Sequence, residues 1–292
     1  MAGSYNHADR NEDGPQDCGA FFLDAVGPYA RGQISIRWSE EPRPTIPAVE
    51  SLIERFWDRR LAQAQREGSK LWDGPLCRLV DYRVNDKSLD MTLGPTGYRA
   101  FVGTNLHNAH LRYLHGPEVL ASPLGVSANV IIGGNYILLG LRSSAVTYHA
   151  GRIHPIGGCI EPSRDGGLPD PFAAMIEELQ EELGVRPDQV GEMVCLGLVR
   201  DKHIVQPELI FDMPVAGSAD EIRARIHATM NTGGEHTELV VVRNHPASVV
   251  TFIESHYAQL TPVALASLLL HGLHNWGSGW FASTRGYLRS LI

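Results

Sequence analysis

The sequence predicts an α/β protein in which a mixed sheet lies between layers of helices, with a smaller α+β domain in front of it. Apolar runs rich in β-branched residues alternate with segments of helical periodicity, which is typical of a sheet covered by helices. Two pairs of such runs are joined by turn sequences, at 85–87 and 133–135. The pattern changes after Gly116-Pro117, so we place a boundary near residues 118–122, between domains of 20–117 and 118–292.

The first part of the chain begins with a segment that we expect to be a mobile tail. Residues 1–19 are rich in Asp, Asn and Gly and contain hardly any apolar residue, so they cannot bury enough surface to become ordered. Residues 33–38 alternate as a short strand. An amphipathic helix over residues 48–67 is predicted by apolar residues at helical spacing: Leu52, Ile53, Phe56, Leu61 and Ala64.

The rest of the N-terminal domain should contain a hairpin and two helical segments. Strands over 76–84 and 88–93 flank the first turn, and residues 96–101 and 105–114 have helical character. The last segment leads into a run of histidines, His107, His110 and His115. Three His within nine residues raise the question of a metal site. No Cys or paired carboxylate accompanies them, so we interpret them as ordinary surface and helix histidines.

The main domain continues with a second hairpin, formed by residues 126–132 and 136–141. The further strands that we predict lie at 193–200, 208–215 and 239–243, and the further helices at 218–230, 247–257 and 262–273. Residues 275–292 contain two Trp and several Gly. They either cover the core or contact a partner.

The clearest helix of the chain lies between Asp170 and Gly184. Asp170 is a suitable N-cap, Pro171 suits the first helical position, and glycine is common where helices end. At about 100° per residue, apolar side chains share one stripe of this helix: Phe172, Ile176, Leu179 and Leu183.

Three carboxylates, Glu178, Glu181 and Glu182, fall on an arc next to this stripe. Like charges three and four residues apart repel each other on a helix, so the arc is either a solvated acidic face or the binding site of a hard divalent cation. The preceding segment favours the cation. It places the pair Gly157-Gly158 after a strand, where a backbone carbonyl and the carboxylates can converge on one ion.

These residues resemble a known motif. Gly157-Gly158-x-x-Glu161, Ala173-Ala174 and Glu178-Leu179-x-Glu181-Glu182-x-Gly184-Val185 are similar to the Nudix box of the Nudix hydrolases. The resemblance implies an α/β/α sandwich fold and hydrolysis of nucleoside diphosphates linked to another moiety, with Mg²⁺, or Mn²⁺ in its place, held by the box glutamates. Glu177 stands where the family usually has Arg, and about five extra residues separate Gly158 from the helix. The first box glutamate would fall at residues 163–165, where the chain has none.

A second resemblance narrows the branch of the family. Several segments are similar to the uridine diphosphate glucose diphosphatase branch, which implies hydrolysis of UDP-glucose or UDP-galactose to UMP and sugar 1-phosphate. Two alternatives stay open: a hydrolase of ADP-ribose or another nucleoside diphosphate, and a non-catalytic Nudix-fold module that binds nucleotides. The segments are Leu71-Trp72-Asp73-Gly74-Pro75 with Arg78, Leu93-Gly94-Pro95-Thr96-Gly97-Tyr98-Arg99, Phe101-Val102-Gly103-Thr104-Asn105 and Pro123-Leu124-Gly125-Val126.

The resemblance also implies roles for residues of the box. We assign Glu178 and Glu182 as catalytic metal ligands, and the Gly158 carbonyl as a further ligand. Glu181 is either a ligand or a solvated side chain. Glu235 and Glu238 follow the helix predicted over 218–230 and precede a strand. Nudix enzymes often draw a base or an extra ligand from a loop at this place, so one of these two glutamates is the candidate.

Four residues outside the box are candidates for binding the substrate. Arg142 ends a strand and either points at the diphosphate or is a surface residue. Tyr98 and Asn105 either bind the uracil or ribose or join the two domains by packing. Glu208 precedes a strand and either binds sugar hydroxyls or is a strand-edge charge.

Composition restricts the classes of partner. The net charge of −8 disfavours a diffuse basic surface for nucleic acid. The partner that the family resemblance implies is a small nucleotide sugar. Four scattered cysteines without a Cys-x-x-Cys pair disfavour disulfides and a zinc site, and favour a reducing compartment. The start lacks a leader pattern, and no apolar run approaches ~18 residues. We therefore expect a soluble cytoplasmic protein, a monomer or a homodimer, that binds neither membranes nor nucleic acid.

Overall fold

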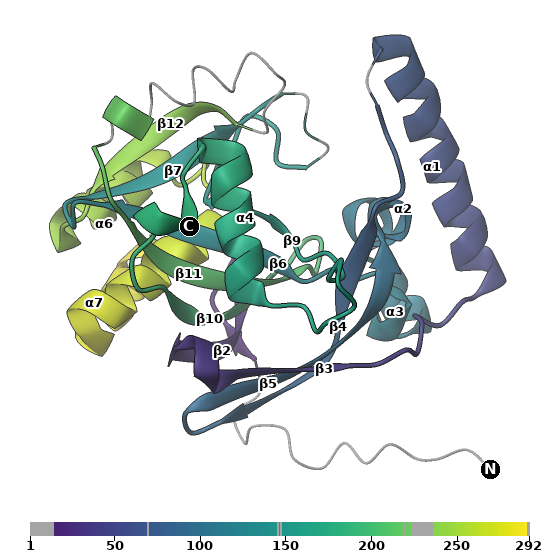
Figure 1. Ribbon diagram of the computed structural model, residues 1–292, viewed down its shortest axis with the longest axis horizontal. Helices are drawn as coiled ribbons and strands as arrows, with labels where there is room; N and C mark the ends of the chain where they lie inside the picture. Colours follow the sequence, from purple (N-terminus) through teal and green to yellow (C-terminus); the bar gives the residue numbers. More distant parts are fainter. Residues whose placement is uncertain are drawn as a thin grey trace.

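The computed structural model describes residues 15–68, 70–144, 146, 148–218, 220–222 and 236–290, and these form two sheets with helices around them (Figure 1). The larger sheet has the order β1-β2-β10-β11-β6-β7-β12, with β8 paired to β7 and β9 paired to β6. Its strands are β1 (Gln16–Asp17), β2 (Phe21–Tyr29), β6 (Gly125–Ile132), β7 (Tyr136–Arg142), β8 (Ile153–His154), β9 (Ile156–Cys159), β10 (Val194–Asp201), β11 (Pro207–Val215) and β12 (His236–Arg243).

This sheet is mixed, as predicted, because β6 and β11 run parallel while β6 and β7 run antiparallel. One edge of β6 is shared between two partners. Residues 130–132 pair with β7, whereas residues 125–128 pair with β9. Strand β7 pairs with β6 only through residues 136–138, and its residues 140 and 141 pair with β8 instead. The sheet therefore opens between β6 and β7 at the end where Gly157 and Gly158 lie.

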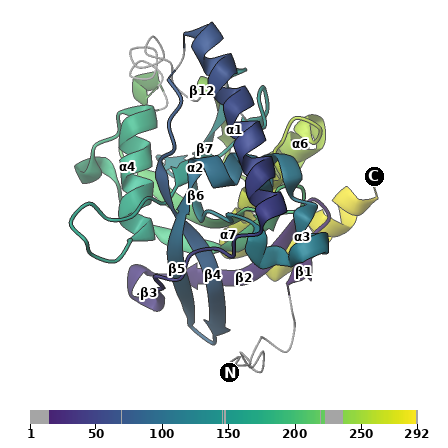
Figure 2. The same ribbon diagram turned by 90° about the vertical axis from the view of Figure 1, so that its right-hand side faces the viewer.

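Helices cover both faces of the larger sheet, which confirms the predicted α/β class. Figure 2 shows α4 (Pro171–Leu183) on one side, and α6 (Pro246–His256) with α7 (Pro262–Arg289) on the other. Two apolar clusters fill the two interfaces. Phe172 and Leu179 of α4 pack in one cluster with Val126 of β6, and Leu268 of α7 packs in the other with Ile210 of β11.

Helix α4 has the predicted caps. The Asp170 carboxylate accepts hydrogen bonds from the backbone N–H groups of Phe172 and Ala173, at 2.9 and 3.3 Å. Gly184 ends the helix in the left-handed conformation, with φ 63°. Both ends of the helix that carries the candidate carboxylates are therefore fixed by local sequence.

Replacing Asp170 with Ala is expected to lower the free energy of unfolding by about 1 kcal/mol, because two helix N–H groups lose their acceptor. The contact of Asp170 with Arg31 is solvent-exposed and should contribute little. Urea unfolding of the variant and the wild type measures the difference. Asp170→Asn, which keeps an acceptor oxygen, is the control and should recover most of the loss.

The smaller sheet contains the predicted hairpin. It has the order β3-β5-β4, formed by β3 (Ile34–Trp38), β4 (Pro75–Asn85) and β5 (Ser88–Gly97). Met91 of β5 lies in the same apolar cluster as Val126 of the larger sheet. The apolar core therefore continues across the boundary that we placed near residues 118–122. The division into two domains stays a prediction.

Strand β2 was not predicted, and it lies in the larger sheet between β1 and β10 although it belongs to the segment 20–117. Its sequence contains Asp24, Gly27 and Pro28, residues that indicate turns rather than strands. The structure accommodates the buried Asp24 because Arg200 of β10 donates two hydrogen bonds to its carboxylate, at 2.7 and 2.6 Å. Without such a partner, a buried charge would be strongly unfavourable.

Helix α1 (Pro47–Glu67) agrees with its prediction, but the predicted helix over 105–114 is wrong in extent. After α2 (Tyr98–Phe101), the chain forms a π-helical turn over Val102–Leu106 and then the short α3 (Leu111–His115). Asn108 donates a hydrogen bond to the Gly103 carbonyl at 2.8 Å, a side-chain bond that competes with regular helix. The ring of His107 stacks on Phe56, with centroids 4.9 Å apart.

The C-terminal segment covers the core. Helix α7 continues past residue 273, where we predicted its end, with a break at Gly277, whose φ is 88°. Phe281 and Leu288 beyond the break are buried in the same cluster as Leu268. None of the helices that the structure describes is both long and apolar enough to cross a membrane. The predicted tail over 1–19 and helix over 218–230 lie largely outside the described residues.

Candidate functional site

The pair Gly157-Gly158 lies in β9, at the opening of the larger sheet. Gly158 pairs with Val126 of β6, and the Glu178 side chain of α4 lies directly against it. A Cβ atom at Gly158 would be 2.1 Å from Oε1 of Glu178, far inside van der Waals contact. The missing side chain therefore lets a helix carboxylate approach the strand backbone.

Glu182, one helical turn after Glu178, contacts a histidine that sequence reasoning did not select. Nδ1 of His236, in β12, is 3.2 Å from Oε2 of Glu182, and the two side chains are 6% and 10% exposed. The ring of His236 lies over Gly140 of β7, where a Cβ atom would be 2.1 Å from the ring. The only sequence signal was the position of His236 beside Glu235, three residues before a predicted strand.

The third carboxylate does not join this group. Glu181 is exposed, and so is Glu177, which was expected to face solvent. Among the residues that the structure describes, no three His, Cys, Asp or Glu side chains are grouped closely enough to hold a metal ion. Mg²⁺ is commonly bound through one or two carboxylates, with water and substrate phosphates as its other ligands, and Glu178 and Glu182 offer that number.

Replacing Gly158 with Ala is expected to lower turnover about a hundredfold while the protein stays folded, since a displacement of about 1 Å at a reacting centre has this effect. The added methyl group would meet the movable end of Glu178. Gly157→Ala is the informative comparison, because its methyl group would lie 2.0 Å from the Val126 carbonyl oxygen and should destabilise the fold. Steady-state kinetics and thermal unfolding of both variants separate the two effects.

Glu208 lies on the opposite face of the sheet. Successive residues of β11 face opposite sides of the sheet: Leu209 packs in the cluster on the α4 side, and Ile210 packs in the cluster on the α7 side. Glu208 therefore faces the α7 side, and it is 6% exposed. Its carboxylate accepts a hydrogen bond from Ser127, and Nε2 of His154 is 3.9 Å away. Burial raises the pKa of Glu208 to about 7, although the Ser127 hydroxyl and Arg142 act against this. Glu208 and Glu178 lie on opposite faces of the sheet, and the predicted contact of Glu208 with sugar hydroxyls stays a prediction.

Arg142 ends β7 as predicted, and it is half-buried. Its Nε donates a hydrogen bond to the Tyr148 carbonyl at 3.0 Å, and the Tyr148 hydroxyl donates to Asp201. Burial disfavours ionisation of Asp201, yet hydrogen bonds from His149, Tyr148 and the His203 amide outweigh it and lower the pKa of this carboxyl. Arg142 therefore belongs to a second polar group, next to Glu208. Its predicted role toward a diphosphate stays a prediction.

The structure argues against Asn105 as a substrate ligand. The residue is 1% exposed, its Nδ2 donates to the Ile204 carbonyl at 2.8 Å, and its Oδ1 accepts from the Ser122 amide at 2.9 Å. These bonds join the π-helical turn to neighbouring loops, which is the packing role weighed as the alternative. Tyr98 is half-buried and packs edge-on against Trp57 and Phe101. Its contact with a base stays a prediction.

Of the two candidates for the catalytic base, the structure describes Glu238 but not Glu235. Glu235 lies outside the described residues. Glu238 is exposed on β12, just after an irregularity in its pairing with β7. Both assignments stay predictions.

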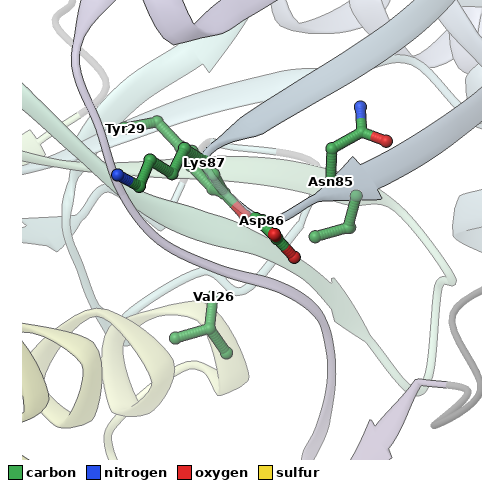
Figure 3. A pocket seen from close by; sticks show the side chains of 6 residues that line it. Val26, Tyr29, Asn85, Asp86 and Lys87 are labelled. Carbon is green, nitrogen blue, oxygen red and sulfur yellow. The ribbon is translucent and has the colours of Figure 1, made fainter.

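One hollow of the molecule lies away from this site. It is lined by Val26 and Tyr29 of β2 and by residues 84–87 at the tip of the β4–β5 hairpin (Figure 3). None of the candidate residues lines it. We place the candidate site at α4, β9 and β12, because the carboxylates of α4 lie against Gly158 and His236 there. The charged side chains that line the hollow are Asp86 and Lys87, both in a hairpin turn.

The chain is similar along most of its length to Nudix hydrolases. A uridine diphosphate glucose pyrophosphatase of Mus musculus is 23% identical over 281 residues, which cover 87% of this chain and 90% of that protein. The Homo sapiens protein of the same description is 24% identical, with coverage of 84% and 88%. Nudix hydrolase 9 of Arabidopsis thaliana is 25% identical over 248 residues, or 72% and 78%. These relatives confirm the resemblance predicted from the motifs.

Among solved structures, a MutT protein from Methanosarcina mazei Go1 matches 52% of this chain and 94% of its own, with 19% identity and a TM-score of 0.36. No family model matches the chain.

Proposed function

We propose that the protein hydrolyses the diphosphate of a nucleoside diphosphate sugar, with UDP-glucose or UDP-galactose as substrate and UMP and sugar 1-phosphate as products. The observation that carries this proposal is the placement of Glu178 and Glu182 on one side of α4, the first against Gly158 and the second against β12. The uracil and sugar are proposed from the uridine diphosphate glucose pyrophosphatases among the relatives.

A divalent ion bound by Glu178 and Glu182 would supply a Lewis acid for the phosphate oxygens and lower the pKa of a bound water. The Glu182 side chain is 10% exposed, and the attraction between a carboxylate and a cation is stronger in such a setting than in water. Gly158 contributes by leaving space and by presenting its backbone carbonyl as a further oxygen donor. Arg142 is the proposed cation for the substrate phosphates, because guanidinium groups bind phosphate oxygens in pairs.

The reaction balances without a further reactant. The oxygen of one water bonds to one phosphorus atom, the bridging oxygen leaves with the other phosphate, and a nearby carboxylate accepts the proton. We assign that acceptor to Glu235 or Glu238, as proposed from the family resemblance.

The test is incubation of the protein and magnesium with UDP-glucose, UDP-galactose, ADP-ribose and ADP-glucose, followed by chromatography of the products. The proposal expects UMP and sugar 1-phosphate from the uridine compounds at the highest kcat/KM. Preferential hydrolysis of ADP-ribose would keep the reaction and change the substrate. No turnover of any compound, together with measurable nucleotide binding, would favour a binding module and contradict the proposal.

A further inference from the structure

His236 is buried but lacks the hydrogen bonds that buried polar groups normally have. Its side chain is 6% exposed, and within the described part of the chain neither ring nitrogen makes a hydrogen bond. Buried polar groups in native proteins almost always have a partner, because the loss of contact with water is otherwise uncompensated. The ring is therefore expected to meet a partner other than these residues.

The geometry toward Glu182 indicates which kind of partner. Nδ1 of His236 is 3.2 Å from Oε2 of Glu182, yet the two atoms are not aligned for an N–H···O hydrogen bond. Two ligand atoms at adjacent positions of an octahedral ion, each about 2.1 Å from it, lie about 3 Å apart. The observed separation is thus the one expected for two atoms that bind the same cation.

Two glycines let the imidazole ring and a helix carboxylate approach the strands closely. The ring lies over Gly140, and any side chain there would displace it, since a Cβ atom would be 2.1 Å from the ring. Glu178, one turn before Glu182, lies against Gly158, which also has no side chain. One glycine therefore lies under the imidazole of His236, and another lies under the carboxylate of Glu178.

We propose that His236 is a ligand of the divalent ion held by Glu182, so that β12 supplies an imidazole nitrogen to a site otherwise made of oxygen atoms. Rotation of Glu178 would bring in a second carboxylate, and water or phosphate would complete the coordination. This inference rests on the proposed function in one respect, that both use the same ion site.

The nitrogen ligand has a consequence for the choice of metal. Carboxylates and water suit Mg²⁺, whereas an imidazole nitrogen favours first-row transition ions, with affinity increasing from Mn²⁺ to Co²⁺. The protein without nucleotide is therefore expected to bind Mn²⁺ and Co²⁺ more tightly than Mg²⁺. His236→Gln should reduce this preference by weakening binding of Mn²⁺ about tenfold or more, with a smaller effect on Mg²⁺.

The experiment is pulsed electron paramagnetic resonance of the full chain loaded with Mn²⁺ in the absence of nucleotide. The wild type is expected to show the ¹⁴N coupling of a directly bonded imidazole, and His236→Gln is expected to lose it. His110→Gln, a change of the same kind at an exposed histidine, is the matched control and should keep both the coupling and the affinity. Isothermal titration with Mn²⁺, Co²⁺ and Mg²⁺ alone gives the affinities.

Absence of nitrogen coupling in the wild type, or its persistence in His236→Gln, would overturn the proposal. The first readout needs no variant, so the proposal stays falsifiable even if His236→Gln does not fold. Glu182→Gln provides a second variant outside β12, and it should weaken Mn²⁺ binding and reduce the coupling together. Hydrolysis by a wild type without nitrogen coupling would reject the histidine ligand and keep the proposed function. Nitrogen coupling without hydrolysis of any substrate would support the histidine ligand and reject the proposed function.

Discussion

Glu182→Gln is expected to lower turnover of the nucleotide sugar at least about a hundredfold, in the range seen when one electrostatic contact to a reacting centre is removed. The amide keeps the shape of the side chain but removes one of the two charges that α4 presents to the ion. Stability without metal should change little, because the contact with His236 can be kept by an amide oxygen and the repulsion from Glu178 is relieved. Steady-state kinetics and thermal unfolding measure the two quantities.

Glu177→Gln is the matched control for this change. It removes the same charge from the neighbouring part of the helix, but Glu177 is exposed and faces away from the sheet. Its turnover should stay within about twofold of the wild type, as is usual for a solvated surface charge. Retention of half the wild-type rate by Glu182→Gln, or an equal loss in both variants, would reject Glu182 as a metal ligand.

Glu208→Gln is expected to make the protein more stable than the wild type at pH 8 and to change little at pH 4.5. The folded-state pKa of Glu208 is raised from 4.5 to about 7 by burial. Between these values the folded state holds a proton that the unfolded state has released, so wild-type stability decreases as the pH rises through this range. The full loss is up to about 3 kcal/mol, from 1.36 kcal/mol for each pKa unit. The Gln variant has no such loss.

Urea unfolding at intervals from pH 4.5 to pH 8 tests this pH dependence. Glu192→Gln, at an exposed glutamate, is the control and should follow the wild-type curve. Parallel curves for the wild type and Glu208→Gln would show that Glu208 ionises normally in the folded protein. The contact of Glu208 with Ser127 would then stabilise its charged form far more than burial disfavours it.

Local sequence was sufficient to predict the elements that carry the candidate carboxylates. Asp170 and Gly184 determine where α4 begins and ends, since each acts on backbone groups within a few residues. The hairpin β4–β5 was predicted for the same reason, because its turn lies between two apolar runs. The mixed sheet followed from the order of strands and helices.

The rest could not be predicted because it depends on contacts between distant residues. Strand β2 contains turn-forming residues and a charge, and the partners of the buried Asp24 are distant in sequence: Arg200, 176 residues away, and Tyr82. His236 reaches Glu182 through the pairing of β12 with β7, which no local pattern indicates. Asn105 belonged to a segment that resembles the family branch, yet the structure uses its amide between two loops.

The separate anchoring of β9 and α4 has a consequence for the way this chain can diversify. Cys159 is paired with Gly125, and α4 begins at its own Asp170 cap, so neither end of the connecting residues relies on the other for its position. Lengthening such a connection costs only about 0.6 kcal/mol for each doubling of its length. Duplications or deletions within residues 161–169 should therefore be tolerated, and this connection is the part of the chain where a library of lengths can be screened for altered substrate range without rebuilding the carboxylate site.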